Sequence, residues 1–203
     1  LRLLPMRMDA FRLLIRAAVA FGGLVVTVVV AGCVSVPLPQ LVPETAATTR
    51  VTTFNMRFVD HSAEDPHERG AAVADYLRET DSDLILLQEM VTIDGYEIVR
   101  PDPLAAVLHD LLPAYGWIRP TGVALLSGSN PILYRRDRYL PLEQGVVWMS
   151  DHPDIPDSRS WGNDIPRYAT WALFYDNAGP AHLFVVNVHL DHLSEYTNER
   201  AID

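Results

Sequence analysis

Three apolar, strand-like runs that each end on a polar side chain constrain this chain most strongly. The runs end at Asn55, Glu89 and His189. In α/β sheets, ligands collect in the crevice at the carboxyl ends of the strands, so the three side chains are predicted to line one pocket. A carboxylate, an amide and an imidazole in one pocket favour metal-assisted hydrolysis as the chemistry.

The composition is that of one globular domain with acidic character. The chain has 203 residues and a hydrophobic content of 49%, which is enough to bury a substantial core. Beyond residue 32 it carries 12 arginines against 25 acidic residues. Because non-specific affinity for nucleic acid comes from Lys and Arg that displace counterions, this balance argues against a general nucleic-acid binder. A single cysteine excludes a disulfide within the chain.

The N-terminal segment has the pattern of an export signal, predicted over residues 1–32. A basic stretch precedes an apolar run of sixteen residues, 17–32, which is shorter than the roughly twenty residues that cross a bilayer. The tetrapeptide at residues 30–33 resembles a bacterial lipobox, so Cys33 is predicted to be the lipidated first residue of the mature protein. Secretion without a lipid and an uncleaved N-terminal anchor are the alternatives, and each places the domain in an extracytoplasmic space. Residues 33–49, rich in Pro, Thr and Ala, are predicted to be a tether.

From residue 50 to residue 203 the pattern predicts one α/β domain. Asp65 is a candidate helix cap, followed by Pro at the first helical position and Glu three residues after the cap, so a helix is predicted over residues 66–79. A second helix is predicted to begin at Asp102-Pro103, and a third after His192. The predicted strands cover residues 50–58, 84–88, 131–134, 139–149, 168–175 and 183–188. This order predicts mixed sheets covered by helices.

Glu89 and Asn55 form the candidate metal site. Carboxylate and amide oxygens are ligands that hard cations such as Mg²⁺ accept while keeping several waters. Two such residues at neighbouring strand ends therefore predict part of a site. The plain alternative for Glu89 is the solvated start of a loop.

His189 and its neighbours are the candidate catalytic and substrate-binding residues. Alternation along a strand places Asn187, His189 and Asp191 on one face. His189 is predicted to donate a hydrogen bond to a phosphoryl oxygen or to act in acid–base catalysis, with Asn187 or Asp191 orienting it. Arg167 is predicted to bind phosphate through its planar guanidinium. A half-exposed edge strand and a surface arginine are the structural alternatives.

Five short motifs carry a family resemblance. They are Asn55-Met56-Arg57, Leu86-Leu87-Gln88-Glu89, Asn130-Pro131-Ile132-Leu133-Tyr134, Ser160-Trp161-Gly162 with Pro166-Arg167, and Asn187-Val188-His189-Leu190-Asp191-His192. In order and spacing they resemble the endonuclease/exonuclease/phosphatase superfamily over about residues 50–203. The resemblance implies a four-layered α/β sandwich of two mixed sheets flanked by helices, and hydrolysis of phosphoesters with Mg²⁺ or Mn²⁺.

The same resemblance implies roles for particular residues. Asn55 and Glu89 match metal-site residues of the family, Arg167 matches a phosphate-contacting arginine, and His189 matches the first catalytic histidine. The implied substrate is a phosphate ester, such as a nucleic acid, a phospholipid headgroup or a small phosphoester. The membrane, reached through the N-terminal lipid, is the other expected partner, and no protein partner is expected.

The chain also departs from the family pattern. Members continue beyond the first catalytic histidine with an Asp-x-Asn motif on a later strand and finish with an Asp-His pair that activates water, and neither is found after His192. The chain is therefore expected to be C-terminally truncated, with little or no activity. One alternative is a lipid-tethered fragment or binding module without catalysis. Another is a dinuclear zinc hydrolase, because the run from Asn187 to His192 is one residue away from the His-x-His-x-Asp-His ligands of metallo-β-lactamase-like proteins. Asn187 in place of the first histidine argues against it.

Overall fold

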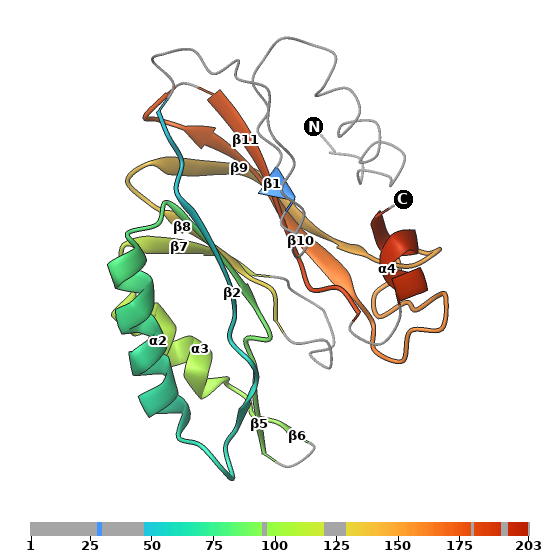
Figure 1. Cartoon of the computed structure of the whole chain (residues 1–203). Coiled ribbons are helices and arrows are strands. Elements are labelled where there is room, and N and C mark those ends of the chain that lie inside the picture. Colours follow the sequence, from blue (N-terminus) through green and yellow to red (C-terminus); the bar gives the residue numbers. More distant parts are fainter. Residues whose placement is uncertain are drawn as a thin grey trace.

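The computed structural model shows that the fold is built around two four-stranded sheets (Figure 1). The residues described are 28–29, 47–94, 97–119, 129–179, 181–191 and 195–202. The first sheet has the order β2 (Val51–Asn55), β4 (Leu84–Gln88), β8 (Ile132–Arg135), β7 (Tyr115–Ile118). The second sheet has the order β1 (Val28–Val29), β11 (Ala181–Val188), β10 (Tyr168–Asp176), β9 (Tyr139–Trp148). A small third sheet joins β3 (Val59–Asp60), β5 (Thr92–Asp94) and β6 (Glu97–Ile98).

Both four-stranded sheets are mixed, as the sequence predicted. In the first sheet β2 runs parallel to β4, whereas β4, β8 and β7 are antiparallel neighbours. In the second sheet β9, β10 and β11 are antiparallel, and β1 lies parallel to β11. The backbone of Val28 and Val29, within the predicted signal segment, pairs with Val185 and Val186. The signal itself stays a prediction.

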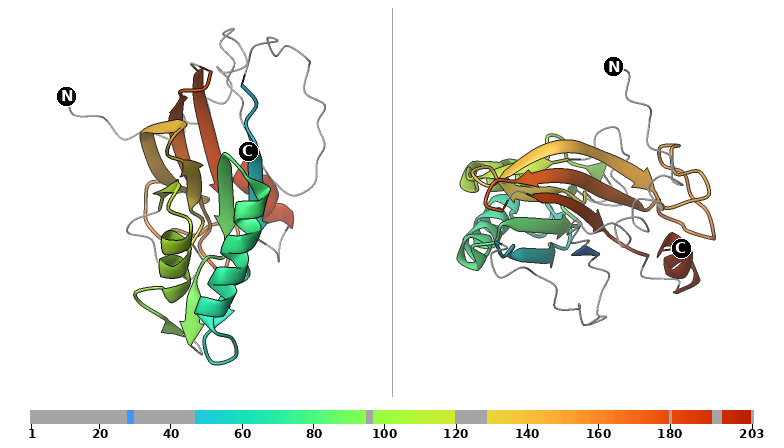
Figure 2. Two further views of the ribbon diagram at one scale, coloured as in Figure 1. Left: turned by 90° about the vertical axis from the view of Figure 1, so that its left-hand side faces the viewer. Right: turned by 90° about the horizontal axis from the view of Figure 1, so that it is seen from above.

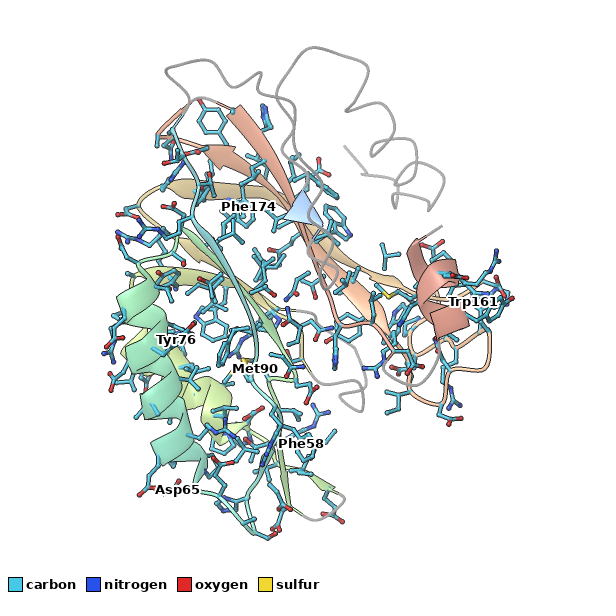
Figure 3. The ribbon with its side chains drawn as sticks, viewed as in Figure 1. Phe58, Asp65, Tyr76, Met90, Trp161 and Phe174 are labelled. Carbon is cyan, nitrogen blue, oxygen red and sulfur yellow. The ribbon has the colours of Figure 1, made fainter. Side chains whose placement is uncertain are left out.

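One buried core lies between the two sheets. Because strand residues alternate between faces, Leu84 and Leu86 of β4 point together toward the second sheet. Leu183 and Val185 of β11 belong to the same buried cluster. Phe174 of β10, labelled in Figure 3, is fully buried in this layer. The alternation thus fixes which face of each sheet meets the other.

Helices α2 (Pro66–Thr80) and α3 (Pro103–Leu111) cover the opposite face of the first sheet (Figure 2). Each begins at an aspartate whose side chain accepts backbone N–H groups, Asp65 from His67 and Asp102 from Leu104 and Ala105. Buried side chains of both helices pack on Ile85 and Leu87 of β4, namely Val73, Ala74, Leu77, Leu104, Ala105 and Leu108. The predicted helix at residues 66–79 and its cap are confirmed.

Helix α4 (Glu195–Ile202) lies beside the outer face of the second sheet. Trp171, Phe184 and Val186 form a buried cluster on this face, and Ala201 of α4 packs against it. The guanidinium of Arg200 lies 5.5 Å from the centroid of the ring of Trp161, so α4 also contacts the loop between β9 and β10. Trp161 is labelled beside α4 in Figure 3. Helices thus flank both sheets, which agrees with the predicted sandwich.

The structure differs from the sequence prediction at several elements. The predicted strand at residues 50–58 is shorter in the structure, where β2 ends at Asn55 and the separate β3 begins at Val59. The φ of 53° at Arg57 interrupts the extended backbone between them. Strands β5, β6 and β7 were not predicted. The end of the predicted tether is bound to the domain, since Arg138 donates to the carbonyl of Thr48 at 2.9 Å.

Some predictions concern residues outside the described part, among them Cys33, His192 and most of residues 1–46. Within the described part, no helix combines the length and the apolar content needed to cross a membrane.

Candidate active site

The structure brings Asn55, Glu89, His189 and Arg167 together at one end of the two sheets. Asn55 ends β2 and Glu89 directly follows β4, and these strands are parallel neighbours with Asn55 opposite Gln88. His189 directly follows β11, and Arg167 directly precedes its antiparallel neighbour β10. Each sheet therefore contributes two of the four side chains.

Glu89 is held by the turn that follows β2. The Asn55 amide Nδ2 donates to Glu89 Oε1 at 2.8 Å, and the backbone N–H of Phe58 lies 3.4 Å from Oε2. The Asn55 Oδ1 accepts the N–H of Arg57 at 2.8 Å. Because that bond occupies Oδ1, the amide nitrogen faces Glu89, and Asn55 orients the carboxylate in this arrangement. Glu89 has a φ of 54°, a conformation that costs energy in non-glycine residues and that clusters at functional sites.

His189 lies between Glu89 and Arg167. Its Nε2 is 3.4 Å from Glu89 Oε1, and its Nδ1 is 3.3 Å from Arg167 Nη1. Arginine can only donate, so a neutral His189 accepts at Nδ1 and carries its proton on Nε2. The Nε2–H therefore points toward Glu89.

Arg167 is a buried cation beside acidic groups. It is 4% exposed, and its Nη2 lies 3.9 Å from Asp191 Oδ1. Burial lowers the pKa of the Arg167 guanidinium, whereas Asp191 and Glu89 act in the opposite direction. Even so, arginine stays charged in proteins. A preorganised guanidinium of this kind suits an anionic oxygen such as that of a phosphate.

The same arginine argues against the dinuclear zinc alternative. Zinc ligands would have to converge from His189 and Asp191, and Arg167 places its positive charge against both. Among the described residues, no three His, Cys, Asp or Glu side chains are grouped to hold a metal ion. A zinc centre of the metallo-β-lactamase kind therefore has no support in this part of the chain.

A magnesium-type site is compatible with the residues present. Mg²⁺ usually keeps several waters and is bound through one or two carboxylates together with substrate phosphates. Glu89 supplies one carboxylate, a quarter exposed and fixed by Asn55. The donor set thus fits a hydrated divalent cation at Glu89.

The buried position of Asn187 contradicts one prediction made from the sequence. It was predicted to contact substrate, but it is 1% exposed and lies between the sheets. Its Nδ2 donates to the carbonyls of Leu87 at 2.7 Å and Pro131 at 2.9 Å, and its Oδ1 accepts from Gln88 Nε2 at 2.7 Å. Both amide hydrogens are therefore used inside the protein. The sequence interpretation missed Gln88, although its parity with Leu84 and Leu86 marks it as facing the second sheet.

A separate cavity of about 440 Å³ lies at the opposite end of the first sheet, lined by Thr48, Thr49, Arg50, Asp81, Asp83, Arg135, Asp137 and Arg138. Its three arginines are all paired with aspartates. The cavity thus offers balanced ion pairs, and no free positive charge for a phosphate comes from this lining.

Comparison with known proteins identifies the fold. No family model and no curated protein matches the sequence. An endonuclease/exonuclease/phosphatase from Bacteroides vulgatus matches with a TM-score of 0.63 at 25% identity, over 75% of this chain and 56% of its own. A functionally unknown conserved protein from Enterococcus faecalis V583 matches with a TM-score of 0.59 at 25% identity, over 75% of this chain and 57% of its own. A mannosyl-6-phosphatase from Bacteroides thetaiotaomicron VPI-5482 matches with a TM-score of 0.61 at 23% identity, over 76% of this chain and 56% of its own.

The chain spans little more than half the length of these solved structures. The chain therefore has the fold of endonuclease/exonuclease/phosphatase proteins, which the motifs of its sequence also resemble.

Proposed function

We propose that this protein is a phosphoesterase that hydrolyses a phosphodiester or a phosphomonoester with Mg²⁺ or Mn²⁺. One observation carries the proposal: Asn55, Glu89, His189, Arg167 and Asp191 form a continuous row of polar contacts across the ends of both sheets. The row contains a carboxylate for a cation and two nitrogen donors for an anion. The likeness in fold to endonuclease/exonuclease/phosphatase structures supports the same chemistry.

Each residue of the row has a distinct role. Glu89 holds the cation, and Asn55 keeps the carboxylate in place through its Nδ2. When bound, the cation polarises a phosphoryl oxygen and stabilises negative charge that develops on it. His189 presents its Nε2–H to a phosphoryl oxygen, and Arg167 adds a fixed positive charge that Asp191 balances.

Charge and the N-terminal pattern indicate the substrate class and the setting. The acidic charge beyond residue 32 favours a small or lipid-linked phosphoester over bulk DNA. The lipobox pattern at Cys33 supports a lipid-anchored protein of the bacterial envelope. We assign no described residue to activation of the attacking water.

A hydrolysis assay tests the proposal. The whole chain is incubated with bis-p-nitrophenyl phosphate or p-nitrophenyl phosphate, in Mg²⁺, in Mn²⁺ and in EDTA. Because the sequence lacks the later motifs of the family, we expect weak but measurable turnover with a metal and none in EDTA. Glu89→Gln keeps the size of the side chain and removes its charge, so it should lower turnover about 100-fold or more. The matched control is Glu79→Gln, at an exposed position on α2, which should behave as wild type.

Two results would reject the proposal. Turnover that is equal in EDTA would exclude the metal, and full activity of Glu89→Gln would remove Glu89 from the site. Binding of Mn²⁺ without any hydrolysis by the wild type would favour the non-catalytic binding module instead.

A further inference from the structure

A buried pair of amide side chains joins the two sheets directly behind the candidate site. Gln88 is the last residue of β4, and Asn187 is the penultimate residue of β11. Gln88 Nε2 donates to Asn187 Oδ1 at 2.7 Å, and the two side chains are 8% and 1% exposed. This is a direct hydrogen bond between two strands of different sheets.

The pair continues the rows of apolar side chains that fill the space between the sheets. In β4 the row is Leu84, Leu86 and then Gln88, and in β11 it is Leu183, Val185 and then Asn187. Each row ends on an amide where hydrocarbon would otherwise continue. An amide is costly to bury unless its groups are hydrogen-bonded, so its presence here calls for a physical reason.

The hydrogen bonds of Asn187 restrain the distance between the sheets. Its Nδ2 donates to the carbonyls of Leu87 in β4 and of Pro131 next to β8, at 2.7 and 2.9 Å. Gln88 Nε2 also lies 3.2 Å from Thr53 Oγ1 in β2. One side chain from the second sheet thus contacts, directly or through Gln88, three strands of the first sheet.

The candidate catalytic residues follow this pair immediately. Glu89 is the next residue after Gln88, and His189 is two residues after Asn187. Their side chains meet at 3.4 Å across the gap between the sheets. Because they come from different sheets, their separation depends on how the two sheets are held at this end.

We propose that Gln88 and Asn187 are positioning residues that set the distance between Glu89 and His189. Neither side chain contacts substrate, and they act through the strands that carry the two polar groups. The expected effect on the reaction rate rests on the proposed phosphoesterase function, whereas the effect on the distance between Glu89 and His189 does not. Active-site groups need placement within about 0.5 Å, and an error of about 1 Å can lower a rate 100-fold.

The test combines a crystal structure with steady-state kinetics of Gln88→Met in the whole chain. Methionine keeps the length of glutamine and its ability to fill the core, but it cannot donate to Asn187. We expect the Glu89 Oε1 to His189 Nε2 distance to exceed the wild-type 3.4 Å. We also expect kcat to fall about 10- to 100-fold with an unchanged KM. Gln144→Met, the same substitution at an exposed position of β9, is the matched control and should change neither quantity.

The outcomes separate the two ideas. A folded Gln88→Met protein with an unchanged distance and an unchanged kcat would overturn the positioning role and leave only a contribution to stability. Absence of hydrolysis by the wild type would reject the proposed function, while the measured distance would still decide the positioning role. If Gln88→Met does not fold, Asn187→Ser takes its place, because the smaller side chain leaves room for a bridging water. The same change in distance and kcat is expected.

Discussion

Arg138 joins the two sheets at the end opposite the candidate site, and its removal should cost a large part of the stability of the fold. It precedes β9 in the second sheet and reaches Asp83, which precedes β4 in the first sheet, at 2.9 Å. It also binds Asp176 at the end of β10 through two hydrogen bonds of 2.9 and 2.7 Å. The three side chains are 13%, 21% and 9% exposed.

The burial of these groups sets the magnitude. Removing one member of a buried ion pair typically costs 3–5 kcal/mol, because the remaining charge is left without a partner. Asp83 is a fifth exposed and can regain water, so we expect Arg138→Met to lose about 3 kcal/mol. For a chain of this size, that loss corresponds to a fall in Tm of about 6–12 °C.

Urea unfolding measures this loss directly. The free energies of unfolding of wild type, Arg138→Met and Arg78→Met are compared at pH 7. Arg78 is 48% exposed and pairs with Asp75 on the surface of α2, so its substitution should cost less than about 1 kcal/mol. A loss for Arg138→Met no larger than that for Arg78→Met would refute the argument from burial.

The pH dependence gives a second check on the same residue. Burial raises the pKa of Asp176, but the hydrogen bonds from Arg138 and from the N–H of Ala178 outweigh it and leave the pKa below its usual value. A carboxyl group with a lowered pKa in the folded state contributes stability above the unfolded pKa of about 3.9. That contribution is lost as the pH falls through 3.9 toward the folded value. The difference between wild type and Arg138→Met should therefore shrink in acid, and a constant difference would contradict the ion-pair explanation.

Three further predictions concern single residues. His189→Gln should lower metal-dependent hydrolysis about 100- to 10,000-fold and leave the circular dichroism spectrum unchanged. The control His109→Gln, at an exposed position, should leave both the hydrolysis rate and the spectrum unchanged. Arg167→Lys should raise KM for a phosphoester about 10- to 100-fold, since the forked guanidinium is replaced by a single ammonium; an unchanged KM would remove Arg167 from substrate binding. Cys33→Ser should abolish incorporation of a labelled fatty acid and release the protein from the membrane fraction, and retained label would exclude lipidation at Cys33.

The placement of the polar strand ends could be predicted from sequence because it depends on local patterns. Asn55, Glu89 and His189 each stand at the end of a strand-like stretch, and parallel or facing strands bring their ends together. Asp65 and Pro66 likewise mark the start of α2 through local hydrogen bonding and backbone preference. Such features need no knowledge of the remote contacts.

Other features depend on contacts between distant segments and could not be predicted in this way. Period-two alternation places Asn187 on a face with His189, but it does not say whether that face meets solvent or a second sheet. The prediction for Asn187 was wrong for this reason. Arg138 contacts Asp176 of its own sheet, 38 positions away, and Asp83 of the first sheet, 55 positions away, and no local pattern marks these contacts. Strand β7 is only four residues long and contains a glycine, so its sequence carries little strand signal.

The most direct test of the account is the position of Mn²⁺ in crystals of the whole chain, located by anomalous diffraction. The account predicts a peak about 2.1 Å from a carboxylate oxygen of Glu89, in wild type and not in Glu89→Gln. A peak that persists in Glu89→Gln, or Mn²⁺ bound only away from Glu89, would contradict the assignment of this strand end as the metal site of a phosphoesterase.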